Sequence, residues 1–195
     1  NIIYTGDDKV YAIIPLTKAL KNDLCTEKES ENDCTKKYKD PNPEGMSGLI
    51  EINTANEGDK ISTHLTLGQF KSNGFAPYLR ISLTLIVAIE KLIAAFNADP
   101  ATGSARIESG YRTWISHKAI YDKKGKTPTE KSYHLDGVAV DLVVSNSKGD
   151  VPKSDVCNAL KILLDKNGGI GVEDSLSSMH FDMRNSSWQD NPCPK

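Results

Sequence analysis

The segment "KSYHLDGVAVDLVV", residues 131–144, decides how this chain is to be interpreted. Its second half is rich in valine, which is typical of a buried strand. Into this apolar pattern it places His134 and, seven residues later, Asp141. Such a pair is either part of a metal site or a surface histidine followed by a strand-end acid. The rest of the chain has to decide between these alternatives.

The overall composition is that of an ordinary globular protein. The chain has 195 residues, enough for one substantial core, with 26% charged and 38% hydrophobic residues. A formal net charge of −2 lacks the excess of positive charge that is typical of proteins that bind nucleic acid. The longest apolar run, "LTLIVAI" at 83–89, is far shorter than the roughly 20 residues that a membrane-spanning helix needs. We therefore expect no nucleic-acid partner and no membrane span.

The four cysteines favour disulfides. Four cysteines allow three pairings, and the sequence alone does not choose among them. The nearest-neighbour solution is Cys25–Cys34 and Cys157–Cys193. None of the four belongs to a C-x-x-C pair, which argues against a zinc–thiolate site or a redox motif.

The same cysteines indicate where the protein works. An even number without metal-site spacing suits an oxidising compartment. Asn185 opens the N-glycosylation sequon "NSS", which agrees with this view. We predict a secreted or otherwise extracytoplasmic glycoprotein with two disulfides.

Local patterns predict an α+β fold with a small antiparallel sheet and flanking helices. Helices are expected over 79–97 and over 154–168, the latter with Ser154 as N-cap and Gly168 as its stop. Residues 115–130 suggest a polar loop. Strands are expected at the following segments: 105–113, 137–145, "GGIGVED" and "SSMHFDMR". Residues 1–60 carry no assignable motif, so we expect an irregular extension there, packed on a domain formed by 61–195.

Five polar residues lie at or near the ends of the predicted strands. These are Arg112, His134, Asp141, His180 and Asp182. In "HFD", residues 180 and 182 lie two apart and share one face of a strand. Two histidines and one carboxylate are a ligand set that leaves a fourth zinc position open for water. The pattern therefore predicts a single zinc site in a cleft.

Three ordered blocks make this prediction specific: "SGYRT", "SYHLDGVAVDL" and "GGIGVEDSLSSMHFDMR". Together they resemble the zinc D-alanyl-D-alanine carboxypeptidase family, the M15 peptidases, over residues 107–184. The resemblance implies a zinc metallopeptidase that cleaves peptide bonds next to D-amino acids, with bacterial cell-wall peptides as its substrate class. It identifies His134, Asp141 and His180 as zinc ligands, Arg112 as a substrate contact with a catalytic role, and Ser132 as a further substrate contact.

The general base departs from the family pattern. Many members carry a carboxylate three residues before the last ligand, and relatives carry a histidine two before it; here these positions are Ser177 and Ser178. The branch ending in H-x-D-x-R points to Asp182, with Glu173 as the second choice. Asp182 also has a purely structural interpretation, as an ion-pair partner of a nearby arginine.

A second function competes with the peptidase. The hedgehog signalling domain shares this metal fold and a similar His-x6-Asp segment, so a zinc-bearing binding, signalling or matrix module without activity is the alternative. That family lacks the SGYR and H-x-D-x-R blocks found here, which favours the peptidase. His64 and His117 are expected to have ordinary structural roles.

Overall fold

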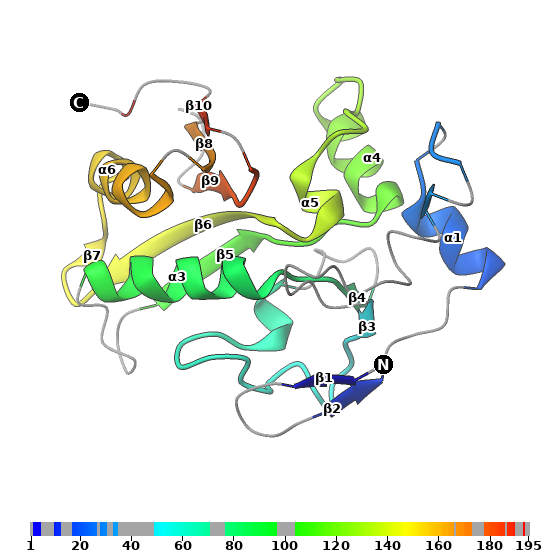
Figure 1. Ribbon diagram of the computed structural model, residues 1–195, viewed down its shortest axis with the longest axis horizontal. Helices are drawn as coiled ribbons and strands as arrows, with labels where there is room; N and C mark the ends of the chain where they lie inside the picture. The colour runs from blue at the N-terminus through cyan, green and yellow to red at the C-terminus, as the bar shows by residue number, and fades with distance from the viewer. Residues whose placement is uncertain are drawn as a thin grey trace.

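The computed structural model describes the chain in several segments. They are residues 2–4, 10–12, 17–26, 28–30, 33–34, 49–70, 77–96, 104–165, 167–172, 178–185, 187–189 and 193. Within them, helices flank antiparallel sheets, and the fold is a mixture of α and β elements as the patterns predict (Figure 1).

The largest sheet carries the three sequence blocks. Its strands run in the order β10-β8-β9-β6-β5, and β7 also pairs with β6. All pairings are antiparallel except the one between β10 and β8. The strand bounds are β5 Ser104–Ser109, β6 Ala139–Asn146, β7 Gly149–Asp150, β8 Gly168–Val172, β9 Met179–Asp182 and β10 Ser187–Gln189.

Strand alternation gives this sheet two different faces. Val140, Leu142 and Val144 of β6 belong to the main hydrophobic cluster, together with Phe181 of β9 and Ile170 of β8. Residues between these positions point to the opposite face, because successive side chains on a strand alternate. The face opposite the core therefore carries the polar residues of the sequence motifs.

Two helices cover the apolar face. They are α3, Leu83–Ala95, and α6, Lys153–Leu164, and they pack on each other as well as on the sheet. Leu85, Ile89 and Leu92 of α3 belong to the same buried cluster as Val156 and Leu160 of α6. Two further helices, α4 (Trp114–Lys123) and α5 (Tyr133–Asp136), lie near the start of β6 (Figure 1).

The N-terminal part contributes short elements. Strands β1, Ile2–Tyr4, and β2, Val10–Ala12, pair with each other, and helix α1 spans Lys18–Leu24. Strand β3, Ile50–Glu51, pairs with β4, Tyr78–Leu79, and a 3-10 turn, η1, covers Leu67–Phe70. Leu24, Leu49 and Ile52 belong to the same buried cluster as the sheet and helices, so this part shares their core.

Three local expectations need correction. Residues 114–123 form helix α4, although a loop was expected over 115–130; Thr113 caps this helix by accepting a hydrogen bond from the Ser116 backbone at 3.2 Å. Helix α3 begins at Leu83: Tyr78 and Leu79 pair with β3, and the N-cap Ser82 is extended and donates its backbone N–H to the Gly137 carbonyl. The N-cap of α6 is Pro152, and Ser154 lies inside its first turn.

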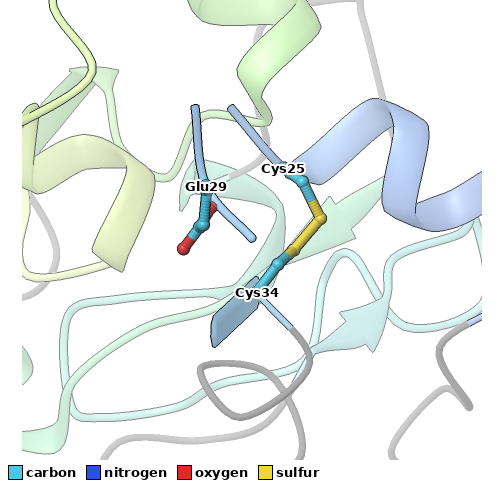
Figure 2. A group of neighbouring side chains, drawn as sticks. All are labelled: Cys25, Glu29 and Cys34. Atoms are coloured by element: carbon cyan, nitrogen blue, oxygen red, sulfur yellow. A yellow bond between two sulfur atoms is a disulfide. The ribbon is translucent and has the colours of Figure 1, made fainter. Parts of the chain in front are cut away.

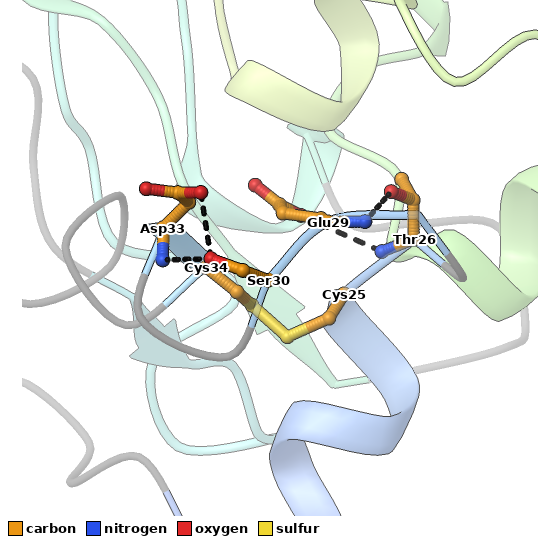
Figure 3. The surroundings of a disulfide bond; sticks show 6 residues. All are labelled: Cys25, Thr26, Glu29, Ser30, Asp33 and Cys34. Carbon is orange, nitrogen blue, oxygen red and sulfur yellow. Dashed lines mark hydrogen bonds between the residues drawn. A yellow bond between two sulfur atoms is a disulfide. The ribbon is translucent and has the colours of Figure 1, made fainter.

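Both nearest-neighbour disulfides are present. Cys25 and Cys34 are bonded, with their Cα atoms 5.8 Å apart, and Cys157 and Cys193 are bonded with Cα atoms 5.6 Å apart. The first closes a small polar loop after α1 (Figure 3), and the second ties residue 193 to α6. Among the described residues, no helix is long and apolar enough to cross a membrane.

Candidate metal centre

His134 reaches the site from the short helix α5. This helix ends at Gly137, whose φ of 72° is in the left-handed region that glycine adopts without strain. The His134 ring is almost fully buried, and its Nδ1–H donates to the carbonyl oxygen of Gly110 at 2.7 Å. This hydrogen bond places the ring proton on Nδ1, so the lone pair of Nε2 is available to bind a metal ion.

Asp141 and His180 are paired across the sheet. Asp141 of β6 lies opposite His180 of β9, and His180 lies opposite Gly171 of β8. Directly opposed residues in a sheet project to the same face, so both polar side chains stand on the face away from the core. The strand register thus brings together two residues that are 39 positions apart in sequence.

Three potential ligand atoms form a tight triangle. His134 Nε2 lies 3.2 Å from His180 Nδ1 and 3.3 Å from Asp141 Oδ1, and the last two atoms are 2.8 Å apart. Ligands about 2.0–2.1 Å from a tetrahedral zinc ion are separated by about 3.3 Å. The donor types and their spacing therefore fit zinc, with one position open.

Without a metal, the same triangle has to hold a proton. Burial alone would lower the pKa of His180, but hydrogen bonds and charges from Asp141 and Asp182 raise it to about 9. Burial raises the pKa of the Asp141 carboxyl, yet the two histidines hold it well below its usual range. The pKa of His134 is lowered, chiefly by burial. The site is thus built to hold positive charge between its three members.

Asp182, the predicted general base, lies beside His180 and Arg184. It is fully buried, and its Oδ2 accepts a hydrogen bond from His180 Nε2 at 3.2 Å, on the ring nitrogen that faces away from the triangle. Arg184 donates to both carboxylate oxygens, with Nε 2.7 Å from Oδ1. Burial would raise the pKa of Asp182, but Arg184 and His180 lower it strongly. Asp182 orients His180.

The glycine at position 169 makes room for this pair. Gly169 lies opposite Asp182 in the sheet. A Cβ atom at position 169 would come within 2.5 Å of Asp182 Oδ2 and 2.8 Å of Arg184 Nε. The "GGIG" segment is therefore explained by close approach within the sheet, and not by a phosphate-binding loop.

Arg112 holds the second oxygen of the Asp141 carboxylate. Its Nη2 donates to Asp141 Oδ2 at 2.7 Å, and its Nε donates to Ser109 Oγ at 2.8 Å. Burial lowers the pKa of Arg112, and the charge of Asp141 opposes that shift. With Oδ2 occupied by arginine, Asp141 offers Oδ1 alone to a metal.

The other predicted site residues have varied placements. Ser132 is the N-cap of α5, is half-buried, and makes no side-chain capping hydrogen bond. Asn185 is exposed. Glu173 lies outside the described residues and follows β8 directly in sequence.

The sequence interpretation missed a buried aromatic row on α4. His117 is fully buried between Trp114 and Tyr121, with ring centroids 5.9 Å and 4.7 Å away. Its Nε2 bonds to the carbonyl oxygen of Thr129 at 3.0 Å, and burial lowers its pKa to about 4. The signal was the spacing 114, 117 and 121, which marks one face of a helix. His117 is therefore a neutral packing residue.

A second group of ligand-type residues lies after α1, but its two cysteines have no free thiolate. Cys25, Glu29 and Cys34 come close together, and Figure 2 shows the two sulfur atoms bonded to each other beside the Glu29 carboxylate. A disulfide sulfur is not the thiolate that a metal requires. Glu29 also accepts a long hydrogen bond, 3.4 Å, from the Thr26 backbone (Figure 3). This group is a structural turn.

Comparison with known proteins finds two distant structural likenesses. The L-Ala D-Glu endopeptidase ChiX of Serratia marcescens is 19% identical, with a TM-score of 0.37 over 53% of this chain and 80% of that one. The vancomycin resistance D,D-dipeptidase VanXYg, in complex with a D-Ala-D-Ala phosphinate analog, is 16% identical, with a TM-score of 0.40 over 72% of this chain and 68% of that one. No family model and no curated protein sequence matches the chain.

Proposed function

We propose that this protein is a secreted zinc peptidase of the D-alanyl-D-alanine carboxypeptidase type, which cleaves peptide bonds next to D-amino acids. One observation carries the proposal. His134 Nε2, Asp141 Oδ1 and His180 Nδ1 converge, while the second polar atom of each side chain is held by a partner: Gly110, Arg112 and Asp182 respectively. Such outer contacts orient ligands in metal sites.

These three atoms would hold zinc, and the ion would polarise a peptide carbonyl and acidify water toward a pKa of about 7. The chain's own residues supply the rest. Arg112 has five N–H donors, and its described contacts engage the Nε–H and one Nη2–H. We assign the remaining donors to a substrate carboxylate or the developing oxyanion. The Ser132 hydroxyl, which α5 does not use as a cap, is assigned to the substrate as well.

Glu173 becomes the proposed general base. Asp182 is held behind His180 by Arg184, so it lacks access to an attacking water. Glu173 follows Val172 directly, and β8 runs beside β9 with Gly171 opposite His180. In this proposal Glu173 takes a proton from water and returns it to the leaving amine.

The domain division and compartment belong to the same proposal. Residues 61–195 would form the peptidase-like part, and residues 1–60 an extension packed on it. Two disulfides support an extracytoplasmic location. The exposed Asn185 supports glycosylation at its sequon.

Hydrolysis of a peptide ending in D-Ala-D-Ala tests the peptidase. Activity should disappear on chelation and return with zinc. The substitution Glu173→Gln should lower the rate about 10²–10⁴-fold without lowering zinc content, because the base is lost and the ligands remain. His64→Gln is the control, since His64 bonds to Glu90 of α3 and is not one of the three proposed ligands.

One specific observation favours the alternative function, a zinc-bearing binding module without peptidase activity. The described side-chain contacts of Asp182 are with His180 and Arg184, which fits an orienting role for this carboxylate. A protein that binds one zinc ion, hydrolyses no D-amino-acid peptide at any zinc concentration and tolerates Glu173→Gln would be such a module.

A further inference from the structure

Arg184 lies where three elements around the metal centre meet. It follows the end of β9, the strand that carries His180. Its guanidinium carbon is 4.3 Å from the centroid of the Tyr133 ring on α5, the helix that carries His134. A Cβ atom at Gly169 of β8 would lie 2.8 Å from its Nε and Nη2 atoms. Arg184 therefore contacts residues of the two segments that carry the histidine ligands, and β8 confines it from a third side.

The Arg184 guanidinium makes two kinds of contact at once. In its plane, Nε donates to Asp182 Oδ1 at 2.7 Å, and Nη2 donates to Asp182 Oδ2 at 2.5 Å. Over the Tyr133 ring, the positive charge is attracted by the electrons of the aromatic face. Because the guanidinium is planar, its edge can pair with a carboxylate while its face lies on a ring, and a lysine ammonium cannot reproduce this geometry.

Helix α5 depends on contacts of this kind for its position. It has only four residues, Tyr133–Asp136, and a helix of this length is not stable by itself. One backbone bond, from the Met183 N–H to the Val138 carbonyl at 2.9 Å, brings the chain beside Arg184 close to the end of α5. The contact between Tyr133 and Arg184 is a side-chain link between the same two segments.

A connected series of contacts therefore runs from one histidine ligand to the other. His180 Nε2 bonds to Asp182 at 3.2 Å, Asp182 accepts from Arg184, and Arg184 lies over Tyr133, the neighbour of His134 in sequence. The ligand nitrogens of the two histidines are 3.2 Å apart, although the residues are 46 positions apart in sequence. The series lies outside the triangle of ligand atoms and uses none of them.

We propose that Arg184 is a positioning residue that holds α5 against β9 through Tyr133, so that His134 and His180 present their ligand nitrogens to one metal ion. The inference rests on the zinc site of the proposed function, but it does not rest on hydrolysis. A site that is ordered before the ion arrives loses less conformational freedom on binding. Removing this contact should therefore weaken zinc binding in a protein that is still folded.

Zinc affinity, measured by competition with a chromophoric chelator at fixed pH and salt, tests the inference. Arg184→Met should weaken zinc binding about tenfold or more, because it releases both Asp182 and the Tyr133 ring. Tyr133→Leu should weaken it about fivefold, because only the ring contact is lost. Tyr133→Phe keeps the ring and should bind zinc like the wild type. The double variant Tyr133→Leu/Arg184→Met should bind zinc like Arg184→Met alone, because both changes remove the same contact.

Two control variants separate positioning from a general loss of stability. Arg106→Met removes a mostly exposed arginine of β5, and Tyr78→Leu removes a partly buried tyrosine of β4 that packs on the core. Both should leave zinc affinity unchanged. The visible absorption of the cobalt-substituted protein is a second measurement, because it reports the geometry of the ligands. Tyr133→Leu and Arg184→Met should alter this spectrum, and Tyr133→Phe should not.

Each outcome has a defined meaning. Unchanged zinc affinity in folded Arg184→Met and Tyr133→Leu proteins, with lower melting temperatures alone, would overturn the positioning role. Effects that multiply in the double variant would also overturn it, because the two residues would then act separately. If Arg184→Met does not fold, equal affinities of Tyr133→Leu and Tyr133→Phe would overturn it.

The fate of the peptidase is decided separately. Coupled effects of Arg184 and Tyr133 in a protein that binds zinc but hydrolyses no D-amino-acid peptide would retain the positioning role and remove the peptidase. Hydrolysis by a zinc protein in which the two residues are not coupled would retain the peptidase and remove the positioning role. A wild-type protein that binds no zinc would overturn both.

Discussion

Two groups of residues in this molecule have side chains of the types that bind metal ions, but the two groups differ in chemistry. His134, Asp141 and His180 gather on the face of the sheet opposite the core, and Cys25, Glu29 and Cys34 gather in the loop after α1. In the first group, the second polar atom of each side chain is held by another residue, so the three potential ligand atoms are directed toward one another. In the second group, a covalent bond consumes both sulfurs. Proximity of ligand residues is therefore not enough to make a metal site.

The largest expected effect separates the two groups directly. His180→Ala should remove stoichiometric zinc and all peptidase activity, because two remaining ligands do not form a stable zinc site. The double substitution Cys25→Ser/Cys34→Ser should leave one zinc per folded chain. Elemental analysis of the purified proteins measures both. If the cysteine variant lost zinc and His180→Ala retained it, the second group would be the metal site and the first would not.

Stability gives the next effect. In the loop-closure relation, a disulfide across 36 residues stabilises by about 4 kcal/mol and one across 9 residues by about 2.5 kcal/mol. Replacing Cys157 and Cys193 by alanine should therefore lower the free energy of unfolding more than replacing Cys25 and Cys34. Denaturant titration of the two variants checks the order. Equal losses would mean that loop length does not govern these disulfides.

The third prediction is the pH dependence of stability and of zinc affinity, which arises from the proton held by His134, Asp141 and His180. In zinc-free protein the pKa of His180 is raised to about 9, against about 6.5 when unfolded. The resulting stabilisation, at most about 3 kcal/mol, is complete below pH 6.5 and is lost as pH rises through 9. Zinc has to displace this proton, so the apparent zinc affinity should rise close to tenfold per pH unit between 7 and 9.

Zinc titrations at several pH values, with proton release followed in two buffers, measure this linkage. The Cys25→Ser/Cys34→Ser protein should show the same slope as the wild type. A flat affinity between pH 7 and 9 would contradict the shared proton.

The smallest effect tests the orienting role of Asp182. Asp182→Asn should weaken zinc about 10–100-fold, or about 1.4–2.7 kcal/mol, because it loosens the ring that supplies Nδ1. Activity per bound zinc should change little. A fall of 10² or more in activity per bound zinc, with unchanged zinc affinity, would restore Asp182 as the general base.

Sequence reasoning grouped His134, Asp141 and His180 because three short blocks, in order, resemble one peptidase family, and each block is local in the sequence. The spacing of His134 and Asp141, and the strand alternation that puts His180 and Asp182 on one face, are properties of short segments. The same alternation also puts Arg184 on that face, but it does not say which ring nitrogen of His180 each carboxylate meets. That choice depends on the pairing of β9 with β6 and β8, which brings Asp141 to Nδ1 and leaves Asp182 at Nε2.

Helix α4 was missed for a different reason. Its lysines and polar residues hide the apolar face formed by Trp114, His117 and Tyr121, and a buried histidine does not count as apolar in a periodicity analysis. The disulfides were easier, because closure between neighbours in sequence has the smallest entropic cost.

The most direct test of the account is a crystal structure of the zinc-soaked protein with anomalous diffraction at the zinc absorption edge. We expect a single anomalous peak, within about 2.0–2.2 Å of His134 Nε2, Asp141 Oδ1 and His180 Nδ1, with Asp182 on the far nitrogen of His180. A peak bound through other residues, or no peak at saturating zinc, would contradict it.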